Sequence, residues 1–285
     1  MTLPITVGID GSSSAERALG WAAAEAVLRH TPLDIVHVNP PITVPPEIPA
    51  ATAMSAAIAT QSRRWLNDAV DIVEAVAPEV PVTAELIEDQ VLDALTRRSS
   101  HAQLLVLGSR GIGGFAQLLV GSVAIALAAH ARCPVAVVRG AVPGPTAPIV
   151  VGIDGSPTSD AALAFAVDEA SLRSAPLVAY HAWRDTVHEP GGQHQPFVLD
   201  WNAIRDAEEK VLAQRLGGWQ DRYPDVEIRH VVERDRPAQG LLRQSARAQL
   251  VVVGSRGRGG LTGMLLGSTS HALIHHGACP VVVAR

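Results

Sequence analysis

Leu104–Arg139 reads LLVLGSRGIGGFAQLLVGSVAIALAAHARCPVAVVR, and Leu250–Arg285 repeats its pattern as LVVVGSRGRGGLTGMLLGSTSHALIHHGACPVVVAR. Each copy contains an apolar run, a glycine-rich loop, a helical pattern that opens on Gly-Ser, and a second apolar run after Cys-Pro. The glycine spacing is the same in both copies: Gly-x-x-Gly, nine residues, then Gly-Ser. The chain is therefore built from two related halves.

The spacing within each copy indicates an anion-binding turn. The apolar runs at 104–107 and 250–253 end in glycine, as buried parallel strands do. Glycine permits a sharp turn and lets another group approach where a Cβ would block it. The next helix opens at Gly121-Ser122 or Gly267-Ser268, and its unpaired N–H groups and partial positive charge favour a phosphate. Either copy alone also fits a plain strand–turn–helix connection.

Length and composition exclude several classes of protein. The 285 residues suffice for two domains, and the formal net charge of −5 argues against nucleic acid as the main partner. Lys210 is the only lysine, so there is no P-loop Gly-Lys-Ser/Thr and, Lys210 itself aside, no Schiff-base lysine. The N-terminus lacks a signal-peptide pattern, and no apolar run reaches about 18 residues without a charge or glycine. We therefore expect a cytoplasmic protein without a membrane anchor.

Other reactive residues give weaker signals. Cys133 and Cys279 hold equivalent positions in the repeat and are expected as buried, small apolar side chains. His271 and His275 are four residues apart, but no carboxylate accompanies them in that segment, so we expect no metal site. Serines follow Asp10 and Asp154 without a histidine partner identifiable by spacing, so we expect no catalytic triad and no catalytic residues.

Strand and helix patterns alternate along each half. The first half is predicted to contain strands at 5–9, 33–38, 82–87, 104–107 and 135–138, and helices at 15–29, 52–76, 91–100 and after Gly121. The second half is predicted to contain strands at 149–153, 177–183, 226–232, 250–253 and 281–284, and helices at 158–174, 200–222, 237–247 and 267–277. Such alternation predicts an α/β fold, with a parallel sheet covered by helices on both faces, twice over.

The domain boundary is predicted from the restart of this pattern. VGIDGSSSAERAL at 7–19 recurs as VGIDGSPTSDAAL at 151–163, and the proline-rich stretch before it has little that can pack. We therefore expect a first domain at 1–140, a linker at 141–148 and a second domain at 149–285.

Polar and glycine residues follow the first and fourth predicted strands of each half. In open parallel sheets a ligand binds outside the carboxyl ends of the strands, where the strand order reverses. If these strands are neighbours, Asp10 faces the same crevice as the loop at 108–114, and Asp154 the same crevice as the loop at 254–260. A phosphate on the loop and a sugar hydroxyl on the aspartate make a nucleotide the natural ligand.

These motifs resemble the universal stress protein family in its tandem, two-domain form, over nearly the whole chain. The ATP-binding members carry Gly-x-x-Gly, nine residues and then Gly-Ser/Thr, and both halves fit without a gap. The starts at VGIDGS and the endings of the Cys-Pro-Val-Val-Val type fit as well. The bias for arginine over lysine, and phrases such as HAWRD and GWQDRYP, are similar to the actinobacterial, mycobacterial-type branch.

The resemblance implies two doubly wound five-stranded parallel sheets of strand order 3-2-1-4-5. It implies one ATP per domain across the first and fourth strands, with Mg²⁺ carried by the phosphates. It also implies that the domains pair through their fifth strands and that the chain forms a homodimer.

Site residues follow from the resemblance by matching motifs. The aspartates would approach the adenosine, the end of the second strand the adenine, and the loops and helix starts the ribose and phosphates. In the first half these are Gly8, Ile9, Asp10, Val38, Gly108, Ser109, Arg110, Gly111, Gly113, Gly114, Gly121, Ser122 and Val123. In the second half they are Gly152, Ile153, Asp154, Ala182, Gly254, Ser255, Arg256, Gly257, Arg258, Gly259, Gly260, Gly267, Ser268, Thr269 and Ser270, with Asp185 a weaker candidate.

One difference between the two loops affects the expected affinity. Ile112 stands where Arg258 does, and arginine compensates phosphate charge through charge-assisted hydrogen bonds. If Arg258 reaches the phosphates, the second site should hold them about 1 kcal/mol more tightly. The alternative is that both side chains face solvent.

Three functions compete at this point. A nucleotide-dependent regulator of the stress or dormancy response requires no chemistry. An ATP hydrolase or phosphoryl-transfer enzyme would be slow, because the chain supplies no P-loop lysine. A module that has lost its ligand is disfavoured by the glycines retained in both loops.

Overall fold

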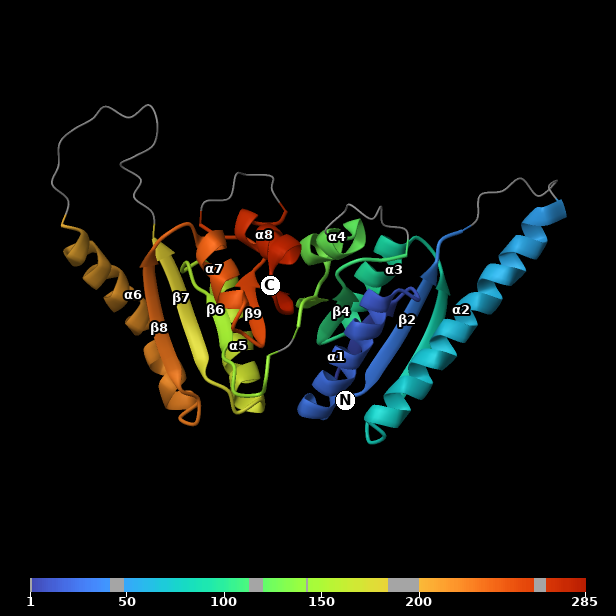
Figure 1. The fold of residues 1–285 in the computed structure, drawn as a ribbon, viewed down its shortest axis with the longest axis horizontal. Helices are drawn as coiled ribbons and strands as arrows, with labels where there is room; N and C mark the ends of the chain where they lie inside the picture. The colour runs from blue at the N-terminus through green and yellow to red at the C-terminus, as the bar shows by residue number, and fades with distance from the viewer. Residues whose placement is uncertain (1, 42–48, 113–119, 142, 184–199, 259–264) are drawn as a thin grey trace, which may run out of the picture. The chain divides into compact units, whose positions relative to one another are not determined.

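The computed structural model describes residues 2–41, 49–112, 120–141, 143–183, 200–258 and 265–285, without the side chains of 49–52. The chain falls into two compact units, one of Met1–Gly140 with Pro280–Val283 and Arg285, the other of Ala141–Cys279 with Ala284. Figure 1 labels the helices and strands of both halves.

The first half is a parallel sheet of order β3-β2-β1-β4-β5. Its elements are β1 (Ile5–Ile9), α1 (Ser13–Arg29), β2 (Leu33–Asn39), α2 (Pro49–Val76), β3 (Val82–Glu88), α3 (Val91–Arg98), β4 (Leu104–Gly108), α4 (Ser122–His130) and β5 (Val135–Val138). Ile5 pairs with Leu33 on one side and with Leu104 on the other, so β1 lies between β2 and β4. The strand order therefore reverses at β1 and β4.

The second half repeats this sheet in the order β8-β7-β6-β9-β10. Its elements are β6 (Ile149–Gly152), α5 (Pro157–Leu172), β7 (Leu177–Trp183), α6 (Trp201–Arg222), β8 (Ile228–Arg234), α7 (Pro237–Ser245), β9 (Leu250–Gly254), α8 (Ser268–His276) and β10 (Val281–Ala284). Ile149 pairs with Leu177 and Leu250, as Ile5 does with its neighbours. The doubly wound α/β fold predicted from the sequence is confirmed in both halves.

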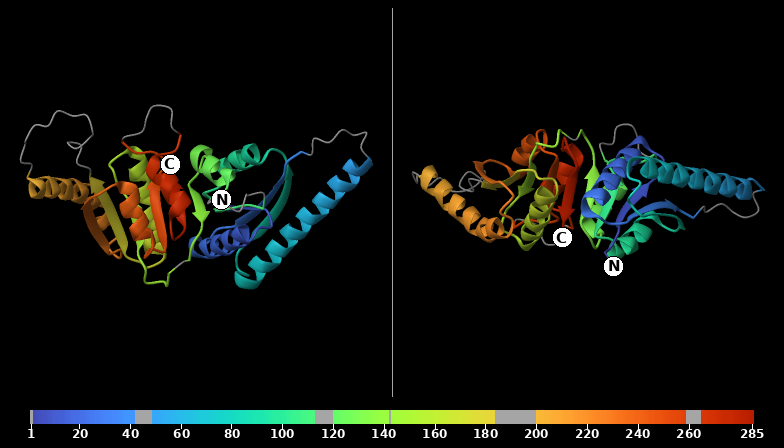
Figure 2. Two further views of the ribbon diagram at one scale, coloured as in Figure 1. Left: turned by 45° about the horizontal axis from the view of Figure 1, so that its top comes forward. Right: turned by 90° about the horizontal axis from the view of Figure 1, so that it is seen from below.

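Helices cover both faces of each sheet (Figures 1 and 2). In the first half α1 contacts α2, and α3 contacts α4; in the second half α7 contacts α8. The central strands are buried apart from Gly8, Gly108 and Gly152 near their carboxyl ends, because helices cover both of their faces, and they are accordingly rich in valine, leucine and isoleucine. Within the described residues, no helix is both long and apolar enough to cross a membrane.

The helix boundaries follow their caps. α1 begins at Ser13 rather than at the predicted residue 15, because the Ser12 side chain accepts a hydrogen bond from the N–H of Ala15 at 3.1 Å. The predicted helix at 91–100 ends as an α-helix at Arg98 and continues as one 3₁₀ turn over Ser99–His101.

Candidate functional site

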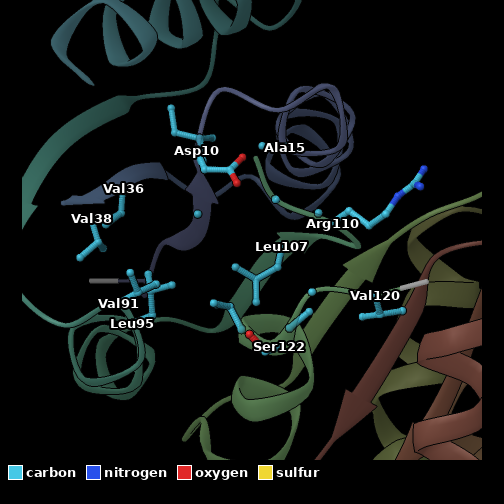
Figure 3. Close-up of a pocket in the computed structure, with 17 residues that line it drawn as sticks. Asp10, Ala15, Val36, Val38, Val91, Leu95, Leu107, Arg110, Val120 and Ser122 are labelled. Atoms are coloured by element: carbon cyan, nitrogen blue, oxygen red, sulfur yellow. The ribbon is translucent and has the colours of Figure 1, made fainter. Parts of the chain in front are cut away.

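The carboxyl ends of β1 and β4 open onto a cavity of about 390 Å³ in the first half (Figure 3). Volumes of about 300–1,000 Å³ are usual for small-molecule sites. The lining comes from the ends of these strands, from β2, α3 and the start of α4: Gly8, Ile9, Asp10, Ala15, Val36, Val38, Val91, Leu95, Leu107, Gly108, Arg110, Gly111, Val120, Gly121, Ser122, Val123 and Ala124. The reversal of strand order therefore coincides with a cavity large enough for a ligand.

One end of the cavity is apolar. Val36 and Val38 reach it from β2, Val91 and Leu95 from α3, and Leu107 from β4. Figure 3 shows these side chains gathered together, while the guanidinium of Arg110 extends away from them. Such a wall suits the flat, weakly polar face of an aromatic base.

The start of α4 also borders the cavity. Its N-cap is Gly121, at φ −71°, and no side chain among the described residues caps the helix. α1, in contrast, carries its own cap at Ser12. The first N–H groups of α4 therefore lie at the cavity without a side-chain partner from the described part of the chain, in the arrangement that favours an anion.

Asp10 ties the loop after β1 to the glycine loop after β4. Its Oδ1 accepts the N–H of Ser12 at 3.0 Å, and its Oδ2 accepts the N–H of Ile112 at 2.9 Å. Asp10 also lines the cavity, and in Figure 3 its carboxylate is drawn near Ala15. Each carboxylate oxygen has capacity for a second donor, so the same group can orient the loops and accept a hydrogen bond from a ligand hydroxyl.

Asp154 joins the two corresponding loops of the second half in the same way. Its Oδ1 accepts the N–H of Ser156 at 2.9 Å and the hydroxyl of Ser156 at 2.6 Å, and its Oδ2 accepts the N–H of Arg258 at 3.0 Å. Burial on its own would raise the pKa of Asp154. The hydrogen bonds from Ser156, Arg258 and Ser159 outweigh burial, so the pKa lies below its usual value.

The loop glycines make room for the protein itself. A Cβ on Gly108 would lie 2.7 Å from the carbonyl carbon of Ser14, where α1 begins. A Cβ on Gly111 would lie 2.4 Å from Oδ2 of Asp10. Gly254 and Gly257 have the same relationships to Thr158 and Asp154. Close internal packing thus requires these glycines with or without a ligand, which weakens their use as an argument against a module that has lost its ligand.

Two serines predicted to bind ligand in the second half are buried within the protein. The Ser270 hydroxyl donates to the carbonyl of Gly254 at 2.6 Å, and Ser270 is buried. Ser255 is also buried. Gly267 is the N-cap of α8, at φ −69°, with no side-chain cap among the described residues. The start of α8 therefore matches the start of α4, although Ser270 directs its hydroxyl at a strand end.

The Arg258 guanidinium lies over Gly155. One of its guanidinium nitrogens lies 1.9 Å from where a Cβ on Gly155 would be, beside the guanidinium of Arg215 from α6. Arg215 is itself paired with Asp160 at 3.1 Å. Ile112, the first-half counterpart of Arg258, is exposed and is not a lining residue of the cavity. Direct contact of Arg258 with phosphate stays a prediction.

Most predicted first-half residues lie on the cavity. Those brought together there are Gly8, Ile9, Asp10, Val38, Gly108, Arg110, Gly111, Gly121, Ser122 and Val123. Ser109 is buried instead, with its hydroxyl 3.4 Å from that of Ser14. In the second half the counterparts Gly152, Ile153, Ala182, Arg256, Ser268 and Thr269 occupy the equivalent strand ends and helix start. Gly113, Gly114, Asp185, Gly259 and Gly260 lie outside the described residues.

Among the apolar lining residues, the sequence predicted only Ile9, Val38 and Val123. The residues missed are Ala15, Val36, Val91, Leu95, Leu107, Val120 and Ala124. Val91 and Leu95 are four residues apart on α3, a spacing that reads as an ordinary core-facing stripe. Only knowledge that α3 faces the end of β1 distinguishes a cavity wall from core.

In the part of the chain that the structure describes, no group of three or more His, Cys, Asp or Glu side chains is arranged so that it could hold a metal ion. Cys133 and Cys279 are both buried and form no disulfide. Burial raises the pKa of the Cys133 thiol to about 11, so Cys133 is a neutral apolar side chain at physiological pH.

Comparisons with known proteins agree with the fold and its duplication. The family model described as "Universal stress protein family" matches residues 1–139 and again residues 146–285. The chain is 44% identical over 291 residues to Universal stress protein Rv2005c of Mycobacterium tuberculosis, covering 99% of this chain and 96% of the relative. It is 43% identical over 293 residues to Universal stress protein Rv2623 of the same organism, covering 100% and 97%.

A solved structure agrees with the fold at lower identity. A universal stress protein from Archaeoglobus fulgidus superposes with a TM-score of 0.71 at 19% identity, covering 99% of this chain and 98% of that one. The resemblance predicted from the sequence, including its similarity to mycobacterial tandem proteins, is confirmed. The chain belongs to the universal stress protein family, with one family domain in each half.

Proposed function

We propose that this protein binds adenine nucleotide, ATP in particular, at the carboxyl ends of its strands and acts as a nucleotide-dependent regulator in the stress or dormancy response. The observation that carries the proposal is the first-half cavity, which has an apolar end at Val36, Val38 and Leu95 and a helix N-terminus at Gly121. A nucleotide has the same two ends, an apolar base and an anionic phosphate chain.

Different residues contact the base, the ribose and the phosphates. The base lies against β2 and α3, with backbone at Val38 in reach of its edge. Asp10 accepts a ribose hydroxyl while it holds the glycine loop. The first turn of α4 receives the phosphates, which would carry Mg²⁺. Asp154, Ala182 and the start of α8 play the same parts in the second half, so the proposal assigns one nucleotide site to each domain.

Regulation is favoured over catalysis as the role of the bound nucleotide. Fast phosphoryl transfer needs positioned cations at the phosphates. Arg110 is the one cationic side chain among the described lining residues, and in Figure 3 its guanidinium extends away from the cavity wall. The second candidate function, ATP hydrolysis or phosphoryl transfer, is therefore expected to be slow.

The remaining parts of the proposal concern assembly and location. The first domain spans residues 1–140, a linker spans 141–148 and the second domain spans 149–285. The domains pair through their fifth strands, the chain forms a homodimer, and the protein works in the cytoplasm through a regulatory protein partner.

The test begins with freshly purified full-length protein. Denaturation followed by mass spectrometry should release an adenine nucleotide, and calorimetry on stripped protein should show ATP binding. Release of phosphate should stay below one turnover per minute. Many turnovers per minute would favour the enzyme, and no binding of ATP, AMP or a cyclic nucleotide would reject both readings.

A further inference from the structure

Tyr180 on β7 holds the position that Val36 holds on β2. The two strands have the same register, because Ile5 pairs with Leu33 and Ile149 pairs with Leu177. Val36 lines the apolar end of the first-half cavity (Figure 3). A phenol ring is much larger than an isopropyl group, so the second half has to place extra volume at the corresponding end of its own crevice.

α7 makes room for this ring through a glycine. Gly240 on α7 corresponds to Ala94 on α3, each one residue before a leucine that faces the sheet. A Cβ on Gly240 would lie 1.7 Å from Oη of Tyr180 and 2.4 Å from its Cζ. Tyr180 is 1% exposed. Its ring is therefore wedged between β7 and α7, whose counterparts β2 and α3 form the apolar wall in the first half.

A third difference between the halves, after those at Tyr180 and Gly240, supplies the hydrogen-bond partner of the tyrosine hydroxyl. Oη of Tyr180 donates to Oε2 of Glu233 at 3.0 Å, and the same oxygen accepts from Nη2 of Arg243 at 2.8 Å. Glu233 on β8 corresponds to Ile87 on β3. Burial, and next the bond to Glu233, raise the pKa of Tyr180, so the hydroxyl stays a neutral donor. Tyr180, Gly240 and Glu233 are thus a matched set.

The neighbouring leucine lies closer to the strand in the second half. A Cβ on Gly152 of β6 would lie 2.9 Å from Cδ1 of Leu241 on α7. The corresponding distance in the first half, from Gly8 of β1 to Cδ1 of Leu95 on α3, is 3.7 Å. Both Gly8 and Leu95 line the first-half cavity. The leucine side chain of the helix therefore lies closer to the backbone of the first strand in the second half than in the first half.

We propose that Tyr180 fills the space in the second site where a base would bind, so that the two domains recognise different parts of a nucleotide. The first domain seats a purine base and its phosphates. The second domain binds the phosphate end at the start of α8 and discriminates little between ATP and a base-free polyphosphate. This inference rests on the proposed function, since it assumes that phosphates bind at the glycine loops, and it replaces the complete nucleotide site assigned above to the second domain with a phosphate site.

Reciprocal exchange of the matched sets provides the test. The variant Y180V/E233I/G240A gives the second half the residues of the first, and V36Y/I87E/A94G does the opposite. Both are made in the full-length chain and titrated calorimetrically with ATP and with tripolyphosphate, and thermal unfolding checks that each is folded. Y180F, which keeps the ring and removes the hydroxyl, serves as the conservative control.

Wild-type protein is expected to bind one ATP at least tenfold more tightly than a second, and tripolyphosphate should displace the weaker one about as well as ATP does. Y180V/E233I/G240A should gain at least tenfold in ATP affinity at the weaker site, and V36Y/I87E/A94G should lose the tighter one. Y180F should leave the asymmetry unchanged.

Two results would overturn the inference in different ways. Two equal ATP sites in wild-type protein, neither yielding to tripolyphosphate, would reject the role of Tyr180 and leave the proposed function standing. Absence of any nucleotide binding would reject the proposed function together with the inference. Both readouts come from wild-type protein, so they decide the question even if an exchange variant fails to fold.

Discussion

The backbone N–H of Ile112 donates a hydrogen bond to the carboxylate of Asp10 at 2.9 Å, across 102 positions of sequence. The same bond joins Arg258 to Asp154 at 3.0 Å in the second half. Each aspartate thereby fixes the glycine loop against the end of the first strand of its half. A ligand that contacts the aspartate will depend on how firmly this bond holds the loop.

The first prediction concerns Asp154→Asn and pH. Because hydrogen bonds hold the folded-state pKa of Asp154 below its unfolded value of about 4, the carboxylate stabilises the fold above that pH. This contribution is lost as pH falls through the folded-state pKa. The variant should therefore melt well below wild type at pH 7, with a smaller difference at pH 3. Asp221→Asn, at an exposed position on α6, is the control; an equal difference at both pH values would contradict the mechanism.

The second prediction separates packing from ligand binding at Gly111. The added methyl of Gly111→Ala would lie 2.4 Å from Oδ2 of Asp10, which accepts the N–H of Ile112, while Oδ1 accepts the N–H of Ser12. Ligand-free protein should lose about 1–3 kcal/mol of stability in urea titrations. Gly20→Ala has nothing within 4 Å and lies within α1, so it should gain up to about 1 kcal/mol. Unchanged stability of Gly111→Ala would show that this glycine serves the ligand alone.

The third prediction is that one substitution at the start of α4 raises stability and lowers ATP affinity. Ser122→Asp places a negative charge in the first turn, which should stabilise the ligand-free helix by about 0.3–1 kcal/mol. The same charge repels phosphate, so ATP affinity at the first site should fall at least tenfold. Ser122→Ala should change affinity by less than about fivefold, since it removes only one neutral hydrogen-bonding group. Calorimetry and thermal unfolding give both readouts, and retained ATP affinity in Ser122→Asp would place the phosphates elsewhere.

The fourth prediction concerns the difference between the two glycine loops. If Arg258 leaves its place over Gly155 to reach a bound phosphate, Arg258→Ile should weaken polyphosphate binding at the second site about fivefold, or about 1 kcal/mol. The reciprocal Ile112→Arg should strengthen binding at the first site. Titration of both variants with tripolyphosphate checks this, and unchanged affinities would show that Arg258 stays packed beside Arg215.

Much of the fold was predictable because it depends on periodicity and order along the chain. Alternating strands and helices, with two related halves, predict the doubly wound sheets, and the placement of Asp10 beside the glycine loop follows once β1 and β4 are neighbours. The sequence offers Ser12, Ser13 and Ser14 as N-caps for the first helix, and the structure shows that Ser12 is the cap.

The rest depends on what each residue faces, which the sequence does not state. Gly108 looks like a glycine that admits a ligand, yet its missing Cβ admits the backbone of Ser14. Leu95 looks like core, yet it lines the cavity. Tyr180 and Gly240 lie 60 positions apart in the chain, and only their contact across β7 and α7 shows that one compensates for the other.

The unequal capping of α1 and α4 has a consequence for amide hydrogen exchange. In α1 the N–H of Ala15 is already held by Ser12, so nucleotide should leave its exchange rate almost unchanged. In α4 the first-turn amides, starting at Ser122, have no side-chain cap from the described residues, and a bound phosphate would become their acceptor. Deuterium uptake would then slow in the first turn of one helix and not in that of the other, which would locate the anionic end of the ligand without a crystal.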